Sequence, residues 1–289
     1  MFSYISRKVK LTIAGLFSGY YERKQILKNM YITMVSQEVR ELLQQEKYLS
    51  PMRLERFGAK VFSQNDEDGI IQEIFNRIGI TNKTFIEIGV GDGLENNTYY
   101  LLLQSWKGCW IEASAHNVKK IKNTFDSYLA NNSLNLIEAF VNKYNINALL
   151  DQAKQGKEPD LFCLDIDSND YHVMESLQVI NPRVIVLEYN AKILPEVSWY
   201  MSYNEHAYWD GSDNFGASLL AFYNLMERKG YHLVGTNITG SNAFFVRKDL
   251  VQNYFYEPAS PIALYNAPRY HLTPGFVVGH PSKQALRPI

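Results

Sequence analysis

Cysteine is scarce in this chain, which has only Cys109 and Cys163 among its 289 residues. Both lie in apolar segments that we expect to form buried strands, so the sequence predicts neither a disulfide framework nor a zinc site. No run of roughly 18 apolar residues occurs either, and a membrane-spanning helix is therefore not expected. Reduced, buried thiols are typical of a cytoplasmic protein, and that is the location that the sequence predicts.

An excess of charge of one sign is also lacking. The 29 basic and 30 acidic residues leave a formal net charge of −1. A protein that binds nucleic acid through its overall charge needs a strongly basic surface, so no nucleic-acid partner is predicted. Apolar residues make up 46% of the chain, which is ample for a buried core. The length fits one large domain, or one domain with an appendage.

The N-terminal segment differs in character from the rest. Its apolar residues recur at spacings of three and four, as on one face of a helix: Phe2, Ile5, Val9, Ile13, Leu16, Phe17 and Tyr20. Six Lys and Arg residues accompany the single acid Glu22 between residues 1 and 28. Such a helix can lie on the anionic inner face of a membrane, or it can pack on the domain or on a second subunit of a homo-oligomer. With a further helical segment expected at 31–45, residues 1–55 form a predicted helical extension.

Residues 56–255 alternate between helical and strand patterns. Five strands are expected, each an apolar run separated from the next by a helical segment: 85–90, 108–112, 134–140, 160–165 and 183–188. Such alternation predicts a mainly parallel sheet with helices on both faces. A late hairpin, 231–235 with 243–247, should add antiparallel strands at the edge of the sheet. Residues 256–289 are rich in proline and are expected to form an irregular strap.

The most informative stretch runs from Phe85 to Gly93, with the sequence F-I-E-I-G-V-G-D-G. A strand there leads into a turn with glycine at every second position, which lets a ligand approach backbone amides that a side chain would shield. The next expected strand ends in the acidic residue Glu112, where a Rossmann-like sheet binds ribose hydroxyls. We therefore expect a nucleoside-bearing cofactor at the carboxyl edge of the sheet.

The acidic residues of this turn narrow the choice of cofactor. Dinucleotide-binding proteins favour G-x-G-x-x-G, but position 94 is Leu. Glu87 and Asp92 would repel a diphosphate, whereas they suit a cofactor that carries an amine and a sulfonium cation. The pattern E-x-G-x-G-D-G resembles motif I of class I S-adenosylmethionine (SAM) methyltransferases, with Glu112 at the position of their ribose-binding acid. That resemblance implies their Rossmann-like α/β fold, which ends in an antiparallel hairpin.

Further motifs narrow the resemblance. Ser63-Gln64 and Glu67-Asp68-Gly69 before a helix, followed by Asn96-Asn97-Thr98, resemble the FkbM-like branch of these enzymes. Many members of that branch methylate hydroxyls of sugars or polyketides. The segments 165–171 and 188–191, with D-I-D-S-N-D-Y and E-Y-N-A, resemble a related bacterial group that often occurs in polysaccharide gene clusters.

The resemblance also assigns cofactor contacts. The glycine amides should run beside the methionine part of SAM, and a neighbouring carboxylate should meet its ammonium group. The acid at the end of the second strand should accept both ribose hydroxyls, and the loop Phe140–Asn142 after the third strand should flank adenine. Gln64 would close over the carboxylate end of the cofactor, or remain a solvated residue before the helix. The predicted cofactor-binding residues are Gln64, Glu87, Gly89, Gly91, Asp92, Gly93, Glu112 and Asn142.

Carboxylates follow the next two strands, and we expect the chemistry there. Asp165 and Asp167 end the strand 160–165, and Glu188 ends the strand 183–188. The carboxyl ends of neighbouring parallel strands meet at one edge, so these groups should face the cofactor methyl. An acceptor hydroxyl with a pKa of about 15 needs a general base or a Lewis acid to lose its proton. Asp165 and Glu188 are therefore candidate ligands for Mg2+ or Mn2+, although the same acids could cap helices or form ion pairs.

An aromatic insertion between the fifth strand and the following helix carries further candidates. Residues 199–209 read W-Y-M-S-Y-N-E-H-A-Y-W. Aromatic rings stack on the apolar faces of sugars, so the insertion is a candidate for binding a sugar or glycan acceptor, although such clusters also serve simple packing. His206 within it is a candidate base, together with His172, His271 and His280.

The sequence thus predicts a SAM-dependent O-methyltransferase that acts on a sugar or glycan hydroxyl, in polysaccharide biosynthesis. Two alternatives stay open. A catalytically inactive scaffold protein on the same fold would bind the cofactor without turnover. A nicotinamide-dependent Rossmann enzyme would need the missing third glycine and a turn that accepts phosphate.

Overall fold

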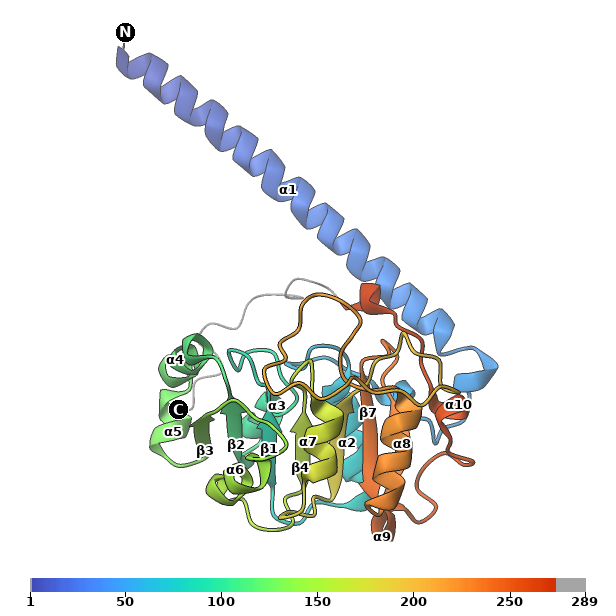
Figure 1. The fold of residues 1–289 in the computed structure, drawn as a ribbon. Helices are drawn as coiled ribbons and strands as arrows, with labels where there is room; N and C mark the ends of the chain where they lie inside the picture. Colours follow the sequence, from blue (N-terminus) through green and yellow to red (C-terminus); the bar gives the residue numbers. More distant parts are fainter. Residues whose placement is uncertain (1, 274–289) are drawn as a thin grey trace.

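The fold centres on one sheet with helices on both of its faces (Figure 1). The computed structural model describes the backbone of residues 2–273 and the side chains of residues 19–273. In that part of the chain the strand order is β3-β2-β1-β4-β5-β7-β6. The strands are β1 (Thr84–Ile88), β2 (Lys107–Glu112), β3 (Leu134–Glu138), β4 (Leu161–Leu164), β5 (Val184–Glu188), β6 (Tyr231–Thr236) and β7 (Asn242–Arg247).

The sheet is parallel except for one strand. β1 to β5 pair in parallel, whereas β7 pairs antiparallel with both β5 and β6. The predicted α/β fold, a mainly parallel sheet with a C-terminal antiparallel hairpin, is therefore confirmed. The second strand of the hairpin lies inside, against β5. The chain moves outward from β1 to β3 and then returns to β4, which leaves a topological switch point between β1 and β4.

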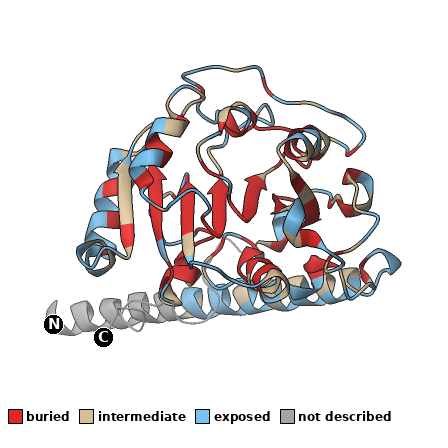
Figure 2. Cartoon of the chain, turned by 90° about the horizontal axis from the view of Figure 1, so that it is seen from below, coloured by how far each residue is buried: buried red, intermediate tan, exposed pale blue. Residues whose placement is uncertain are grey.

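Two apolar cores occupy the two faces of the sheet (Figure 2). α6, α7 and α8 pack on one face together with Ile86 and Ile88 of β1, and α2, α3 and α4 pack on the other together with Phe85. This alternation follows from the two-residue period of a strand. The helices of the domain are α2 (Glu67–Ile78), α3 (Tyr99–Leu103), α4 (Ala115–Thr124), α5 (Asp126–Ala130), α6 (Ile146–Ala153), α7 (Asp170–Ser176), α8 (Leu219–Arg228), α9 (Lys248–Val251) and α10 (Pro261–Leu264).

α1 (Phe2–Leu42) is one continuous helix, rather than the two separate segments that the sequence predicts. It contains no proline, and its two glycines cost only about 1 kcal/mol each, which is too little to break it. α1 projects from the domain and meets it where the Tyr31 hydroxyl donates to the backbone carbonyl of His271 (Figure 1). The amphipathic face predicted for residues 2–17 lies outside the described side chains. No helix among the described residues combines the length and the apolar composition that crossing a bilayer requires.

The residues between α1 and α2 pack against the C-terminal segment. They form two short 3-10 helices, η1 (Glu46–Tyr48) and η2 (Leu54–Phe57). Arg53 and Glu55 form a buried ion pair of 2.6 Å, and Arg53 also donates to the carbonyl of Ala263. The predicted strap is irregular up to residue 273, apart from α10 and a 3-10 helix, η3 (Tyr270–Leu272). Residues 274–289, which include His280, lie outside the described part, and the domain boundaries at 55 and 255 stay predictions.

Candidate functional site

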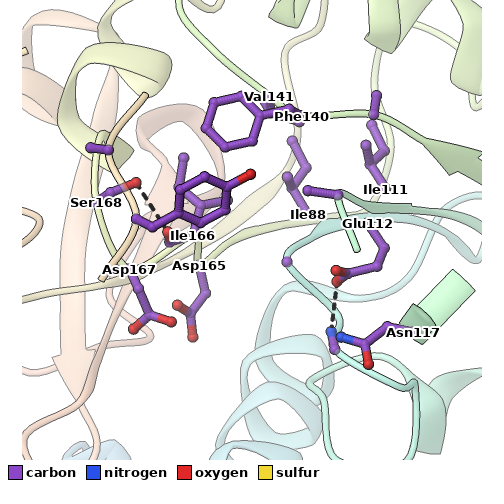
Figure 3. A pocket seen from close by; sticks show the side chains of 16 residues that line it. Ile88, Ile111, Glu112, Asn117, Phe140, Val141, Asp165, Ile166, Asp167 and Ser168 are labelled. Atoms are coloured by element: carbon purple, nitrogen blue, oxygen red, sulfur yellow. Dashed lines mark hydrogen bonds between the residues drawn. The ribbon is translucent and has the colours of Figure 1, made fainter. Parts of the chain in front are cut away.

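A cavity of about 250 Å³ lies at the carboxyl ends of the central strands, at the switch point between β1 and β4. Open α/β sheets bind their ligands at this position. The lining comes from the ends of β1 and β2, from the loops after β3 and β4, from α4 and from the aromatic insertion. It consists of Ile88, Gly89, Gly91, Ile111, Glu112, Ala113, Asn117, Ala139, Phe140, Val141, Asp165, Ile166, Asp167, Ser168, Ala207 and Tyr208 (Figure 3).

The glycine turn after β1 takes backbone conformations that glycine adopts most easily. Gly89, Gly91 and Gly93 have φ angles of +84°, +57° and +82°. A Cβ on Gly89 would lie 1.6 Å from the carbonyl oxygen of Asp165, and one on Gly93 would lie 2.8 Å from the Trp110 ring. A Cβ on Gly91 would meet no atom within 4 Å. Gly89 and Gly93 thus allow the turn to pack closely, whereas Gly91 borders the open space of the cavity.

Glu112 at the end of β2 is held by two backbone amides. Its Oε2 accepts the N–H of Gly91 at 2.9 Å (Figure 3), and its Oε1 accepts the N–H of Ser114 at 2.8 Å. A carboxylate offers about four acceptor positions, so two remain after these bonds. The residue is buried and lines the cavity. A fixed carboxylate with acceptor positions to spare is suited to bind a pair of neighbouring hydroxyls.

The walls beyond Glu112 are apolar and aromatic. Ile111 and Val141 border the cavity together with the Phe140 ring, which packs against the Tyr208 ring at a centroid distance of 5.2 Å. Such rings suit a flat, apolar portion of a ligand. The sequence predicts an adenine contact for the loop that contains Phe140. The structure adds Tyr208 to the same wall. Tyr208 belongs to the insertion that the sequence analysis predicts to bind the acceptor.

Two asparagines, one from each of the segments 165–171 and 188–191, anchor the aromatic insertion. Asn169 donates from Nδ2 to the carbonyl of Asn204 at 2.7 Å, and its Oδ1 accepts the N–H of Asn204 at 3.2 Å. Asn190 donates from Nδ2 to the carbonyl of Asp213 at 2.7 Å. These bonds tie Asn204, within the insertion, and Asp213, just after it, to the loops after β4 and β5. Tyr208 lies between the two anchors, and this explains its place at the cavity.

Three carboxylates gather at the edge of the cavity. Asp165, Asp167 and Glu188 each have an oxygen within 4.8 Å of the others. Burial raises the pKa of Asp165 well above its usual value, and the Asp167 carboxylate raises it further. Burial and the Asp165 carboxylate likewise raise the pKa of Glu188. Carboxylates this close cannot all hold their charge without a shared proton or a bound cation. The cluster can therefore act as a base or as a ligand set for a hard cation.

Apart from the other candidate histidines, seven predicted site residues lie outside the cavity lining, within the part of the chain that the structure describes: Gln64, Glu87, Asp92, Gly93, Asn142, Glu188 and His206. Glu87 accepts hydrogen bonds from the N–H of Asn97 at 2.9 Å and from the Thr98 hydroxyl at 2.5 Å. Burial raises the pKa of Glu87 to about 7, although both bonds act to lower it. Its carboxylate thus fastens the loop before α3.

The remaining side chains of this group have local roles or face solvent. Asp92 forms an ion pair of 3.4 Å with Lys120. Asn142 accepts the backbone N–H groups of Tyr144 and Asn145, at 2.9 and 3.0 Å, and so stabilises the start of α6. Gln64 and His206 are exposed. Contacts of these residues with a cofactor or an acceptor stay predictions.

Asn117 is a lining residue that the sequence analysis does not single out. It lies in the first turn of α4, where its N–H donates to the side chain of the capping residue Ser114 at 3.4 Å. Asn117 lines the same cavity as Glu112 (Figure 3). The serine cap directly after β2 is the signal that could have identified it, because a helix that begins there presents its first turn to the cavity.

No protein-family model matches the sequence, and no curated protein matches it. Similar solved structures include a putative caffeoyl-CoA O-methyltransferase from Staphylococcus aureus, with 14% identity, 77% of this chain and 99% of that chain covered, and a TM-score of 0.46. A Podospora anserina methyltransferase bound to S-adenosylhomocysteine (SAH) has 15% identity, 76% and 88% coverage and a TM-score of 0.43. An O-methyltransferase from Bacillus cereus in complex with SAH has 14% identity, 75% and 89% coverage and a TM-score of 0.40. At such identities and scores the likeness concerns the fold alone and carries nothing about the reaction of this chain.

Proposed function

We propose that this chain is a SAM-dependent O-methyltransferase of the FkbM-like type, which acts on a hydroxyl of a sugar or glycan in polysaccharide biosynthesis. The observation that carries the proposal is Glu112. Its buried carboxylate is fixed by the Gly91 N–H at 2.9 Å and lines the cavity at the switch point of the sheet. A carboxylate in this position binds the two hydroxyls of a ribose.

The charge of the cavity favours a cationic cofactor over a dinucleotide. Three of its sixteen lining residues are the acids Glu112, Asp165 and Asp167, and no Lys or Arg from residues 19–273 lines it. A pyrophosphate would meet negative groups there without a compensating cation. The sulfonium and ammonium groups of SAM are attracted to the same carboxylates. The nicotinamide-dependent alternative is therefore disfavoured.

The residues that line the cavity fit SAM along its length. The open space beside Gly91 admits the cofactor close to the backbone, and Glu112 would hold its ribose. Phe140 and Tyr208 would contact adenine, and Asp165 would meet the positive charge near the sulfur. Bound SAM supplies a methyl group on a positively charged sulfur, which an acceptor oxygen displaces in line. Positioning of the two reacting atoms is the main task of such a site.

The carboxylate cluster would receive the proton of the acceptor hydroxyl. The raised pKa values of Asp165 and Glu188 make these groups stronger bases than ordinary carboxylates. In a second version of the proposal, Asp165 and Glu188 would hold Mg2+ or Mn2+, and a bound cation would lower the pKa of the acceptor hydroxyl. The mutual approach of the three carboxylates to within 4.8 Å is compatible with both versions. His206 as an alternative base is exposed and lies outside the lining.

Exposed aromatic side chains near the cavity support a sugar acceptor. Tyr208 and Trp209 of the insertion are exposed, and so is Tyr144 in the loop after β3. Tyr144 meets Tyr203 of the insertion edge to face, at a centroid distance of 6.0 Å. Aromatic rings that stay open to water stack on the apolar faces of sugar rings.

Thermal-shift measurements with SAH, NAD and NADP test the class of cofactor. A ligand at about a hundred times its Kd adds about 2.7 kcal/mol to the free energy of unfolding, which raises Tm by several degrees. We expect this shift with SAH and not with NAD or NADP. Stabilisation by NAD alone would contradict the proposal. Methyl transfer is then assayed by mass spectrometry of a panel of glycans incubated with the protein and SAM. Binding of SAH without methylation of any glycan would favour the scaffold alternative.

Tyr208→Ala is expected to weaken SAH binding about tenfold. The change removes one of the two rings at the adenine end of the cavity, and stacking of a base on an aromatic ring contributes about 1–3 kcal/mol. Trp209→Ala is the matched control, because Trp209 is the next residue and is exposed, but it does not line the cavity. Titration calorimetry compares the two variants. Equal losses in both would mean that the insertion as a whole, and not the Tyr208 ring, affects the cofactor.

A further inference from the structure

α1 carries an apolar face that the domain does not cover. Leu27, Met30 and Met34 are 66%, 56% and 67% exposed, and their spacing of three and four places them on one side of the helix. The side chains by which α1 contacts the domain, Tyr31 and Glu38, lie on the same side, near the C-terminal end of the helix. The apolar face is therefore open to a partner along the part of α1 that projects from the domain (Figure 1). Large apolar side chains that gather on one exposed surface mark a site of interaction.

Basic side chains accompany this face. Residues 1–30 contain six Lys and Arg residues and one acid, Glu22, which gives a formal charge of +5, whereas the rest of the chain carries −6. Arg23 and Lys24 are both exposed. Arg23 follows Tyr20 by three positions and precedes Leu27 by four, so it lies within the apolar stripe. Positive charge beside an exposed apolar stripe suits the phosphates and acyl chains of an anionic lipid surface.

The helix joins the domain close to the carboxylate cluster. His271 in η3 accepts the Tyr31 hydroxyl with its carbonyl, and its Nε2 lies 2.8 Å from Glu38 Oε1 of α1. Tyr189, the residue after Glu188, donates its hydroxyl to the carbonyl of Asn266, four residues before η3, at 2.8 Å. Burial and the Glu188 carboxylate both raise the pKa of Tyr270 in η3. η3 thus links α1 to the candidate active site. A surface that binds α1 would lie on the side of the domain from which α1 projects (Figure 1).

We infer that α1 docks the protein on an anionic membrane surface, with the stripe of Tyr20, Leu27, Met30 and Met34 against the lipid and the basic side chains at the headgroup phosphates. A second copy of the chain could also cover the apolar stripe. Two copies would, however, bring two segments of charge +5 together, whereas an anionic bilayer neutralises each of them. If the proposed function also holds, α1 brings the acceptor site close to glycans that are linked to lipid.

Vesicle flotation of the full-length protein tests the inference. Vesicles of phosphatidylcholine are compared with vesicles of phosphatidylcholine and phosphatidylglycerol, without cofactor or acceptor, so that the result does not depend on the proposed function. We expect the protein to float with the anionic vesicles only and to be released by high salt, which screens charges at a surface. Equal binding to both kinds of vesicle, or binding to neither, would overturn the inference.

Variants of α1 separate charge from apolar contact. Each basic residue near an anionic surface strengthens binding about fivefold, so Arg23→Gln with Lys24→Gln is expected to lower the partition coefficient about thirtyfold. Lys119→Gln with Lys122→Gln is the matched control, because it removes the same charge from exposed positions of α4 and should change nothing. An equal loss in both double variants would overturn docking through α1.

A second copy of the chain on the apolar stripe would be detected as a dimer. Sedimentation velocity of the wild type at low concentration, without vesicles, is expected to show a single copy of the chain. A stable dimer that Leu27→Glu dissociates, combined with no flotation, would mean that a second copy covers the stripe. An unchanged Tm of every α1 variant shows that the domain is folded, since Leu27 is exposed and lies outside the domain core.

Discussion

Glu112→Ala is expected to weaken SAH binding by a factor of about a hundred or more, while the domain stays folded. The carboxylate is the proposed acceptor of two ribose hydroxyls, and hydrogen bonds to a charged group contribute about 1.5–3 kcal/mol each. The change also leaves the N–H groups of Gly91 and Ser114 without this partner, which loosens the turn at the cavity. Titration calorimetry measures the loss of affinity, and circular dichroism checks the fold.

Glu138→Ala is the matched control for this variant. Glu138 ends β3 and lies directly beside Glu112 in the register of the sheet. It is exposed and does not line the cavity. Wild-type affinity is therefore expected in the Glu138 variant. The same affinity in both variants would remove Glu112 from the cofactor site, and with it the observation that carries the proposed function.

Turnover is expected to fall by a factor on the order of a hundred or more in Asp165→Asn and in Glu188→Gln. Both changes keep the size of the side chain, but an amide cannot take up a proton and is a poorer ligand for a hard cation. Glu188 does not line the cofactor cavity, so its variant should keep the wild-type affinity for SAH. Asp151→Asn, at an exposed position of α6, is the control. Wild-type rates in both cluster variants would exclude the cluster from catalysis.

A chelator distinguishes the two roles of the cluster. Loss of turnover in EDTA that Mg2+ or Mn2+ restores is expected if Asp165 and Glu188 hold a Lewis acid. Turnover that resists EDTA leaves a carboxylate as the base, which must be deprotonated to act. Because burial raises the pKa values of Asp165 and Glu188, the rate would then increase with pH over a range above that of an ordinary carboxylate. A rate independent of pH and of EDTA would fit neither role.

Local chemistry suffices to predict the sheet and part of the cavity. Short apolar strands that alternate with helical segments specify a parallel sheet, whatever the distant parts of the chain do. Gly89 and Gly91 could be identified because the turn after β1 needs positive φ angles, which favour glycine. Glu112 could be identified because it ends the next strand, and parallel strands bring their carboxyl ends to one edge.

Packing between distant residues determines what the sequence does not predict. Residues 115–129 lie in one of the helical segments that the sequence predicts between the strands, but the chain divides there into α4 and α5 at Phe125. The Phe125 ring packs against Tyr99 and Trp110 at centroid distances of 4.9 and 4.8 Å, and neither partner is visible in the local periodicity. Tyr208 likewise meets the cavity through contacts with segments far away in the sequence. Side-chain partners of this kind emerge only from the folded chain.

The two asparagines that anchor the aromatic insertion bind backbone groups, in the insertion and just after it. Asn169 binds both the carbonyl and the N–H of Asn204, and Asn190 binds the carbonyl of Asp213. Backbone groups of this kind are present in every residue, so the bonds do not depend on which side chains the insertion carries. Apart from Ala207 and Tyr208, which line the cavity, residues 205–212 therefore form an exchangeable segment on a fixed frame. If the proposed function holds, grafting other side chains at these positions would change the choice of acceptor, while Tyr208 and the carboxylates keep their places.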